Sequence, residues 1–223
     1  MYFMLHIGKT GGSYTRHVFS VIPRARSLVR ILDHSHSLET ALKEFPAEKA
    51  IFAIRDPFQI FISGFYSRRR KGQPRYNVPW SADETVAFSA FGTPNELAEA
   101  LGSADRQRRD RAEFSMRNIF HVARCLHFYL GSVPLLREHQ PRIAFILRQE
   151  HLDADIHAFL VANGIGTPPA QITDEVIRHA NPTTLDRTLS QRAIRNLSIW
   201  YRTDLELYRE CQAIVSGLNP SSH

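Results

Sequence analysis

The sequence predicts an α/β protein with a three-layer, P-loop-like fold, in which helices flank a central and mainly parallel sheet. Short apolar runs alternate with amphipathic stretches of helical periodicity along the 223 residues, and this alternation is typical of parallel strands joined by helical crossovers. Residues 50–54 form a continuous apolar run, as buried parallel strands do. A turn rich in small residues separates the first apolar run from a helical stretch. We therefore expect a single domain over residues 1–223, with residues 68–111 as an insertion.

Three pairs of a strand and a helix are expected in the first third of the chain. In order, they are a strand at Phe3–Ile7 with a helix that follows the turn Gly8–Ser13 and reaches about Val21, a strand at Leu28–Leu32 with a helix near Leu38–Phe45, and a strand at Ala50–Ile54 with a helix from Pro57 to about Tyr66. Asp56 supplies the N-cap of the third helix, and Pro57 suits its first position.

The rest of the chain carries weaker patterns. The middle of the chain is expected to contain a long polar loop at Arg68–Asp83, a helix at 94–101 with a capping box at Thr93–Glu96, a loop or exposed helix start at Ser103–Arg111, and helical structure at 114–139 broken near Gly131–Pro134. A strand at Ile143–Leu147 and a helix capped by Asp153, which ends before Gly164, follow. After them we expect a loop at 163–170, a short helix from Thr173–Asp174 and a last helix capped by Ser190. The last helix should pack one face on the sheet, formed by Ile194, Leu197, Tyr201, Leu205 and Tyr208.

The composition favours an anionic partner. The chain has 28 Lys and Arg against 22 Asp and Glu, a formal net charge of +6 and an isoelectric point near 9.6. Of the basic residues 24 are arginine, whose fixed donor fork suits phosphate and sulfate. A GC-rich genome produces the same bias without functional meaning. Cys125 and Cys211 lack the spacing of a disulfide framework or a zinc site.

The sequence also bears on location. No apolar run approaches the roughly 18 residues that a bilayer span requires. Residues 1–6 lead directly into the first motif, which we interpret as the absence of a secretory or transit segment. The expectation is a cytoplasmic protein without a membrane span.

The turn Gly8–Ser13 carries the strongest functional signal. It lies between a strand and a helix, where backbone N–H groups and the positive end of the helix bind anions. Lys9 adds a full charge beside these donors. The turn is not a Walker A loop, because Phe3 stands where that motif requires its first glycine. The expected phosphate site consists of Lys9, Thr10, Gly11, Gly12 and Ser13; a tight strand–helix turn without a ligand is the alternative.

A second polar group follows the third expected strand. Arg55 leaves the carboxyl end of that strand, where open α/β sheets bind ligands. Ser63 follows about two helical turns later, and the two side chains together suit a second phosphate. Asp56 also resembles the aspartate of a Walker B strand, which keeps a nucleotide-hydrolysing function open.

In this order, the two motifs resemble those of sulfotransferases that use 3′-phosphoadenosine 5′-phosphosulfate (PAPS). IGKTGGS is similar to their 5′-phosphosulfate loop, and RDPxxxxxS to their 3′-phosphate motif. The closer match is to the carbohydrate-type branch, which includes uronyl 2-O-sulfotransferases and many bacterial proteins. Residues 145–152, with an E-x-L helix start, and residues 189–208 also resemble that family. The resemblance covers most of the chain, and residues 68–140 are the part with the weakest match to the family.

One position departs from the family. A second arginine often lies five residues after the first, and this chain has Ile60 there. The run Arg68–Lys71 is then a further candidate for holding the cofactor, although such charge runs are more often solvated loops.

The resemblance implies transfer of a sulfonyl group from PAPS to an acceptor hydroxyl, without a metal. Lys9 is then expected on the bridging oxygen of the leaving phosphosulfate, the loop N–H groups on the 5′-phosphate, and Arg55 with Ser63 on the 3′-phosphate. The family's catalytic histidine follows its second strand, a position that His36 matches, with His34 as the alternative. An imidazole accepts a proton readily at neutral pH. His6, beside the loop, is expected to pack or to support the site.

The acceptor is expected to be a carbohydrate or glycoconjugate on the side of residues 68–111. Four aromatic residues there suit sugar stacking and core packing about equally: Tyr76, Trp80, Phe88 and Phe91. Two other functions stay open. One is a P-loop nucleotide kinase with Lys9 on phosphates and Asp56 on magnesium. The other is a non-catalytic binder of nucleic acid through the arginine-rich loops, which lacks a stacking aromatic motif; we expect no nucleic-acid partner. The sequence does not indicate an oligomeric state.

Overall fold

The structure is a computed structural model that describes residues 1–166 and 185–218. The chain divides into two compact units. Of the described residues, the sheet unit contains 1–55, 126–166 and 206–218, and the helical unit contains 56–125 and 185–205. Residues 68–111, the expected insertion, belong to the helical unit.

The sheet has four strands, β1 (Tyr2–Leu5), β2 (Val29–Ile31), β3 (Lys49–Ile54) and β4 (Ile143–Arg148), in the order β2-β1-β3-β4. Every neighbouring pair is parallel, and Met4 of β1 pairs with Ile31 on one side and Ile51 on the other. The predicted α/β fold with a parallel sheet is therefore confirmed. The strand order reverses beside β1, and open α/β sheets bind ligands beyond the carboxyl ends of their strands at such a reversal.

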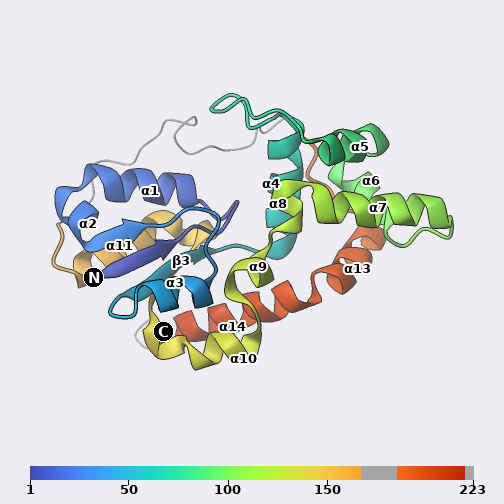
Figure 1. Cartoon of the computed structure of the whole chain (residues 1–223). Helices are drawn as coiled ribbons and strands as arrows, with labels where there is room; N and C mark the ends of the chain where they lie inside the picture. The colour runs from blue at the N-terminus through green and yellow to red at the C-terminus, as the bar shows by residue number, and fades with distance from the viewer. Residues whose placement is uncertain (167–184, 219–223) are drawn as a thin grey trace. The chain divides into compact units, whose positions relative to one another are not determined.

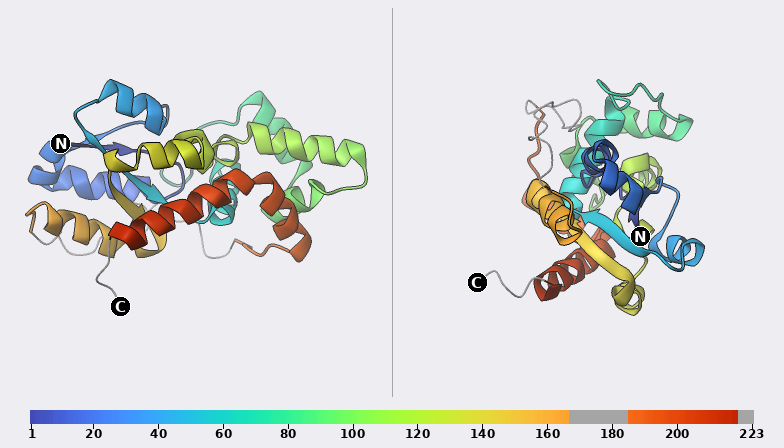
Figure 2. Two further views of the ribbon diagram at one scale, coloured as in Figure 1. Left: turned by 90° about the horizontal axis from the view of Figure 1, so that it is seen from below. Right: turned by 90° about the vertical axis from the view of Figure 1, so that its left-hand side faces the viewer.

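Helices cover both faces of the sheet, as Figures 1 and 2 show. One face carries α1 (Gly12–Val21), α2 (Pro23–Leu28) and α11 (Leu152–Ala162). The other carries α3 (Leu38–Glu44) and α14 (Arg202–Leu218), of which residues 206–218 belong to this unit. The unit also contains α9 (Leu126–Leu130), α10 (Val133–Glu138) and two 3₁₀ turns, η1 (Gln140–Arg142) and η2 (Gln149–His151).

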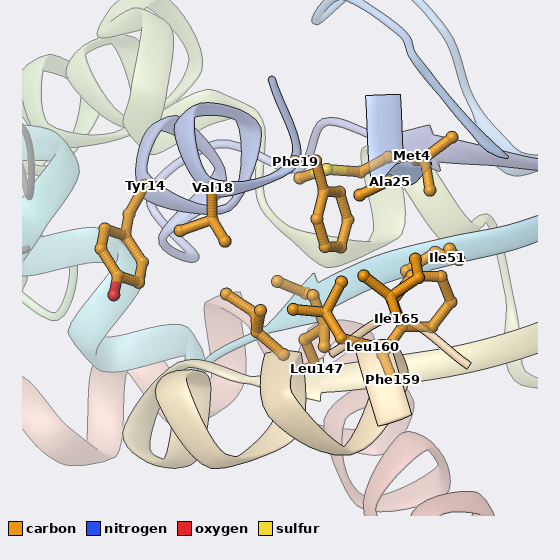
Figure 3. Close-up of a cluster of buried hydrophobic side chains, with 13 residues drawn as sticks. Met4, Tyr14, Val18, Phe19, Ala25, Ile51, Leu147, Phe159, Leu160 and Ile165 are labelled. Atoms are coloured by element: carbon orange, nitrogen blue, oxygen red, sulfur yellow. The ribbon is translucent and has the colours of Figure 1, made fainter. Parts of the chain in front are cut away.

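The strands bury side chains on both faces because successive residues of a strand point to opposite sides. Met4 and Ile51 belong to a cluster with side chains of α1 and α11 (Figure 3). In that cluster the rings of Phe19 and Phe159 are 5.4 Å apart between centroids. Phe3, next to Met4 in β1, and Phe52, next to Ile51 in β3, are fully buried on the opposite face of the sheet. Burial on both sides explains why these strands read as continuous apolar runs.

The helical unit consists of α4 (Pro57–Arg69), α5 (Ala82–Ala90), α6 (Pro94–Ala100), α7 (Arg106–Asn118), α8 (Phe120–Ala123) and α13 (Gln191–Trp200). Asp56 caps α4 as expected, since its carboxylate accepts the N–H groups of Phe58 and Gln59 at 2.9 and 3.0 Å. Gly64 allows α8 to approach α4, because a Cβ at this position would lie 2.7 Å from the carbonyl oxygen of His121.

Arg68 is not part of a solvated charge run. Its side chain is buried and donates two hydrogen bonds to Glu84, Nε to Oε1 at 2.6 Å and Nη2 to Oε2 at 2.5 Å. The same guanidinium donates to the carbonyl of Pro79 at 3.1 Å. Glu84 accepts the N–H groups of Ser81 and Phe120 as well, at 3.1 and 3.2 Å. This ion pair ties α4, α5 and the start of α8 together.

Two helices were not expected from the sequence. α2 follows α1 after a break at Ile22 and begins with Pro23 at its first position. α5 begins inside what the sequence suggests is loop, and Ser81 with Glu84 forms its capping box. In addition, β1 ends at Leu5 rather than at residue 7.

The last expected helix is two helices. Ser190 caps α13 as predicted, with its hydroxyl accepting the N–H of Ala193 at 3.1 Å. The helix is interrupted at Tyr201, whose buried hydroxyl donates to the carbonyl of Val122 at 2.9 Å. The expected single face is therefore not continuous: Ile194 and Leu197 belong to α13 in the helical unit, and in α14 Leu207 and Cys211 are buried, whereas Leu205 and Tyr208 are only half-buried.

Two further expectations need comment. α11 is preceded by His151 rather than capped by Asp153, because η2 leads directly into it. The helix expected from Thr173–Asp174 lies outside the described residues. Among the helices of residues 1–166 and 185–218, none is both long and apolar enough to cross a membrane.

Candidate functional site

The carboxyl ends of the four strands bring polar residues to one edge of the sheet. β1 leads into His6 and the phosphate loop, which we define as Gly8–Ser13. β2 leads into a loop with His34 and His36, and β3 into Arg55. Because all strands are parallel, these segments meet where α/β sheets bind ligands. Ser63 is half-buried on α4 in the helical unit.

The backbone of the phosphate loop turns through two left-handed residues. Lys9 has φ 65° and Gly11 has φ 90°. The buried hydroxyl of Thr10 donates to the carbonyl of Ile7 at 2.9 Å and fixes the turn from inside. A left-handed lysine is uncommon, and such backbone positions are concentrated at ligand sites.

Two of the three glycines in the loop, Gly11 and Gly12, are closely approached by side chains from other segments. A Cβ on Gly11 would lie 2.5 Å from Cδ2 of Leu152, at the start of α11. A Cβ on Gly12 would lie 2.5 Å from Cδ2 and 2.6 Å from Nε2 of His6. A larger residue at either position therefore requires the loop or the contacting side chain to move.

The start of α1 is open to an anion. Gly11 occupies the N-cap position without a side-chain hydrogen bond, and the first turn contains no acidic residue. The carbonyl of Gly11 accepts the N–H groups of Tyr14 and Thr15, each at 3.1 Å. The N–H groups of Gly12 and Ser13 precede these and have no acceptor within the helix. Together with the positive end of the helix, they form a site of positive potential.

Arg55 lies against the phosphate loop. Its Nη1 donates to the carbonyl oxygen of Lys9 at 3.2 Å, and its side chain is half-buried. The structure therefore brings together Arg55, from the end of β3, and the loop that follows β1. Two cationic side chains accompany the backbone donors at this edge of the sheet.

The segment that follows β4 contacts the phosphate loop and the start of α1. The hydroxyl of Tyr14 in α1 donates to Oδ1 of Asp153 at 2.6 Å. Arg148, the last residue of β4, forms a two-pronged ion pair with the buried Asp155, at 3.0 Å from Nε and 2.6 Å from Nη2. These hydrogen bonds raise the pKa of Arg148. The charge of Arg148 is thus used to anchor α11, which in turn carries Leu152 beneath Gly11.

His6 packs between the loop and the second strand's carboxyl end. It is 8% exposed, and its ring lies on the ring of His34 with the centroids 3.8 Å apart and an interplanar angle of 35°. Burial first, then His34 and Arg16, lower the pKa of His6 from 6.5 to about 3. His6 is therefore a neutral imidazole at physiological pH.

His36 is held between two carboxylates. Its Nδ1 is 3.0 Å from Oδ1 of Asp33, and its Nε2 is 3.3 Å from Oε2 of Glu44 at the end of α3. Asp33 is itself fixed by the hydroxyl and N–H of Ser35, and these hydrogen bonds lower the pKa of Asp33 to about 2. Asp33 orients the imidazole of His36.

The run Arg68–Lys71 and Asp56 have structural partners. Arg69 donates to the carbonyl of Phe91 at 3.1 Å, and Arg70 to that of Gln73 at 2.7 Å. Asp56 caps α4. Within residues 1–166 and 185–218, no three His, Cys, Asp or Glu side chains are grouped as ligands for a metal ion.

The four aromatic residues expected on the acceptor side differ in burial. Phe88 and Phe91 are buried core residues. Trp80 is half-buried, stacks on Phe88 at 4.9 Å and donates from Nε1 to the carbonyl of Arg68 at 2.7 Å. Tyr76 is 47% exposed.

His6 was expected to pack beside the loop or to support it, and its ring does lie against Gly12. The sequence did not reveal that Leu152 meets Gly11 or that Asp153 binds Tyr14. The E-x-L segment at 150–152 was the one signal that could have found Leu152. Among known proteins, no protein-family model, curated protein or solved structure matches the chain.

Proposed function

We propose that this protein is a sulfotransferase that binds PAPS at the carboxyl edge of its sheet and transfers the sulfonyl group to an acceptor hydroxyl. The observation that carries the proposal is the uncapped start of α1, with Lys9 in the loop before it and Arg55 against that loop. The helix start and Lys9 fit a 5′-phosphate, and Arg55 beside them supplies a second cationic group for the 3′-phosphate. The resemblance of the two motifs to those of PAPS-dependent enzymes selects this cofactor among phosphate-bearing ligands.

The reaction is an in-line displacement at sulfur. The acceptor oxygen forms a bond to sulfur while the bond from sulfur to the bridging oxygen breaks, and 3′-phosphoadenosine 5′-phosphate (PAP) leaves. Lys9 neutralises the charge that develops on the bridging oxygen. The N–H groups of residues 10–13 hold the 5′-phosphate as fixed dipoles that need no reorganisation. Arg55 binds the 3′-phosphate, and no step in this scheme requires a metal.

His36 is the proposed acceptor of the hydroxyl proton. The carboxylate of Asp33 at its Nδ1 is the arrangement that orients a catalytic imidazole. Its Nε2 faces Glu44, so the acceptor hydroxyl has to replace that carboxylate as the partner of Nε2. His34, on the same loop, is the alternative.

The two other functions have less support. In a nucleotide kinase Asp56 would bind magnesium, but its Oδ1 accepts two backbone N–H groups at the start of α4. A nucleic-acid binder would present the run Arg68–Lys71 to phosphates, but Arg68 is buried in its ion pair with Glu84.

We assign the acceptor to hydroxylated carbohydrates and its binding to residues 68–111 and their neighbours. A groove of about 770 Å³ lies between α5 and α7, with Arg106 and Arg111 beside Val86 and Phe114 in its lining. Both cysteines are buried thiols, which agrees with a reducing compartment. The proposal therefore places the enzyme in the cytoplasm.

The test is transfer from labelled PAPS to a panel of hydroxylated carbohydrates. We expect product with at least one acceptor, and a roughly 10²–10³-fold lower rate for Lys9→Ala, the usual loss when one stabilising group is removed. Lys43→Ala is the matched control, since Lys43 is 74% exposed on α3 and pairs only locally with Glu39 among the described residues. Full activity of Lys9→Ala would refute the assignment of the loop.

A further inference from the structure

His6 occupies an unusual position for a histidine outside the reacting groups. Its ring fills the space beneath Gly12, the first residue of α1, and leaves no room for a Cβ there. The same ring lies against the ring of His34, with the two centroids 3.8 Å apart. Two imidazoles thus form a stack that begins at the phosphate loop and ends at the loop after β2.

The charged groups around this stack come from three segments. Lys9 in the phosphate loop, Arg16 in α1 and the loop after β2, with Asp33 and His34, all act electrostatically on His6. His6 is 8% exposed, whereas His34 is half-buried and therefore closer to water. Protonation of His34 therefore costs less free energy than protonation of the more buried His6, because burial disfavours the charged form of an imidazole.

We propose that His6 is a positioning residue that couples the phosphate loop to His34, so that a phosphate in the loop draws a proton onto His34 while His6 stays neutral. The inference rests on the proposed phosphate site. The buried His6 ring contacts both Gly12 and His34, and the field of a phosphate is screened less through protein than through water. Because the His6 ring meets Gly12 of the phosphate loop, an anion held by that loop lies close to the stack.

The coupling deepens the proposed reaction. When the bond from sulfur to the bridging oxygen breaks, PAP keeps the electron pair and becomes more negative. A positively charged His34 near the loop offsets part of this charge, and opposite charges favour one another most where water is excluded. His34 then differs in role from His36, the proposed proton acceptor.

The experiment follows the imidazole carbons by NMR through a pH titration, with and without saturating PAP. His34→Gln assigns the His34 signal, and adenosine is the matched ligand without phosphate. We expect PAP to shift the pKa of His34 upward by about one unit, as for unit charges roughly 10 Å apart at an effective dielectric constant of about 20. Adenosine should leave it unchanged.

Two variants of His6 separate coupling from mere support of the fold. In His6→Ala water enters beneath Gly12, and the shift should fall to roughly a quarter, the ratio between dielectric constants of about 20 and about 80. In His6→Leu the space stays filled and most of the shift should remain. A full shift in His6→Ala, or an equal loss in both variants, would overturn the inference. PAP that binds without moving His34 refutes the inference alone, whereas the absence of PAP binding, measured by calorimetry on the same samples, refutes the proposed function with it.

Discussion

His6 also links stability to pH. The pKa of the folded side chain is lowered to about 3, chiefly by burial, whereas a histidine in the unfolded chain titrates near 6.5. Between these values the unfolded chain binds a proton that the folded chain does not, so stability rises with pH by at most about 1.4 kcal/mol per pH unit. We expect His6→Leu to remove this contribution in urea unfolding between pH 7 and about pH 5. Identical pH slopes for the two proteins would show that His6 is not a buried neutral imidazole.

His36 and His34 are distinguished by paired substitutions. If His36 accepts the proton, His36→Ala should lower turnover by roughly 10²–10⁴-fold, with PAP affinity nearly unchanged because the ring is held by Asp33 and Glu44 rather than by the phosphate loop. His34→Ala should cost less. Turnover and PAP affinity are measured on both variants. Wild-type turnover in His36→Ala together with loss in His34→Ala would move the proton acceptor to His34.

Among the elements of the helical unit, α4 and α5 depend on one buried ion pair. Removing one partner of the Arg68–Glu84 pair leaves an uncompensated charge, and such changes cost about 3–5 kcal/mol. We expect Arg68→Ala to lower the free energy of unfolding by this amount in urea titrations. Arg106→Ala is the control, because Arg106 is 86% exposed and 3.6 Å from Asp110, where exposed pairs contribute at most about 1 kcal/mol. Equal effects of the two substitutions would show that the buried pair is not a structural anchor.

The elements that the sequence predicted well are those with a local cause. β3 is a continuous apolar run, and α4 begins at an aspartate followed by proline. α2 and α5 were missed because their short segments lack a clear apolar stripe, although Ser81 and Glu84 form a capping box. The interruption at Tyr201 was missed because Tyr201 is held by a hydrogen bond to Val122, 79 positions away, which the local sequence does not reveal.

The candidate site also has parts that the local sequence predicts and parts that it does not. The loop and its lysine are visible in the sequence as small residues between a strand and a helix. What fixes the loop is not visible, since Leu152 and Asp153 reach it from the far end of the sheet order, and their contacts depend on the tertiary fold. The buried role of Arg68 was hidden for the same reason, because its partner lies 16 positions later.

At the scale of the whole molecule, the sheet order explains why distant residues serve one site. The chain leaves β1 to form β2 on one side and returns to form β3 on the other, so the phosphate loop lies between the segments that follow these two strands. The order brings Arg55 against Lys9, 46 positions away. The proposal that this edge binds a nucleotide with both a 5′- and a 3′-phosphate follows from that juxtaposition together with the motif resemblance.

Calorimetric titration of the wild type and Arg55→Ala with PAP and with adenosine 5′-phosphosulfate, which lacks the 3′-phosphate, tests whether Arg55 holds the 3′-phosphate at this edge of the sheet. We predict that the wild type binds PAP and that Arg55→Ala weakens PAP by about 1.5–3 kcal/mol, the value of a charge-assisted hydrogen bond, or roughly 10- to 100-fold. The loss for adenosine 5′-phosphosulfate should be much smaller and reflect only the contact of Arg55 with the loop. Arg26→Ala, an exposed arginine of α2, should bind both ligands as the wild type does. Equal losses for the two ligands would place Arg55 away from the 3′-phosphate, and a wild type that does not bind PAP would rule out the proposed cofactor site.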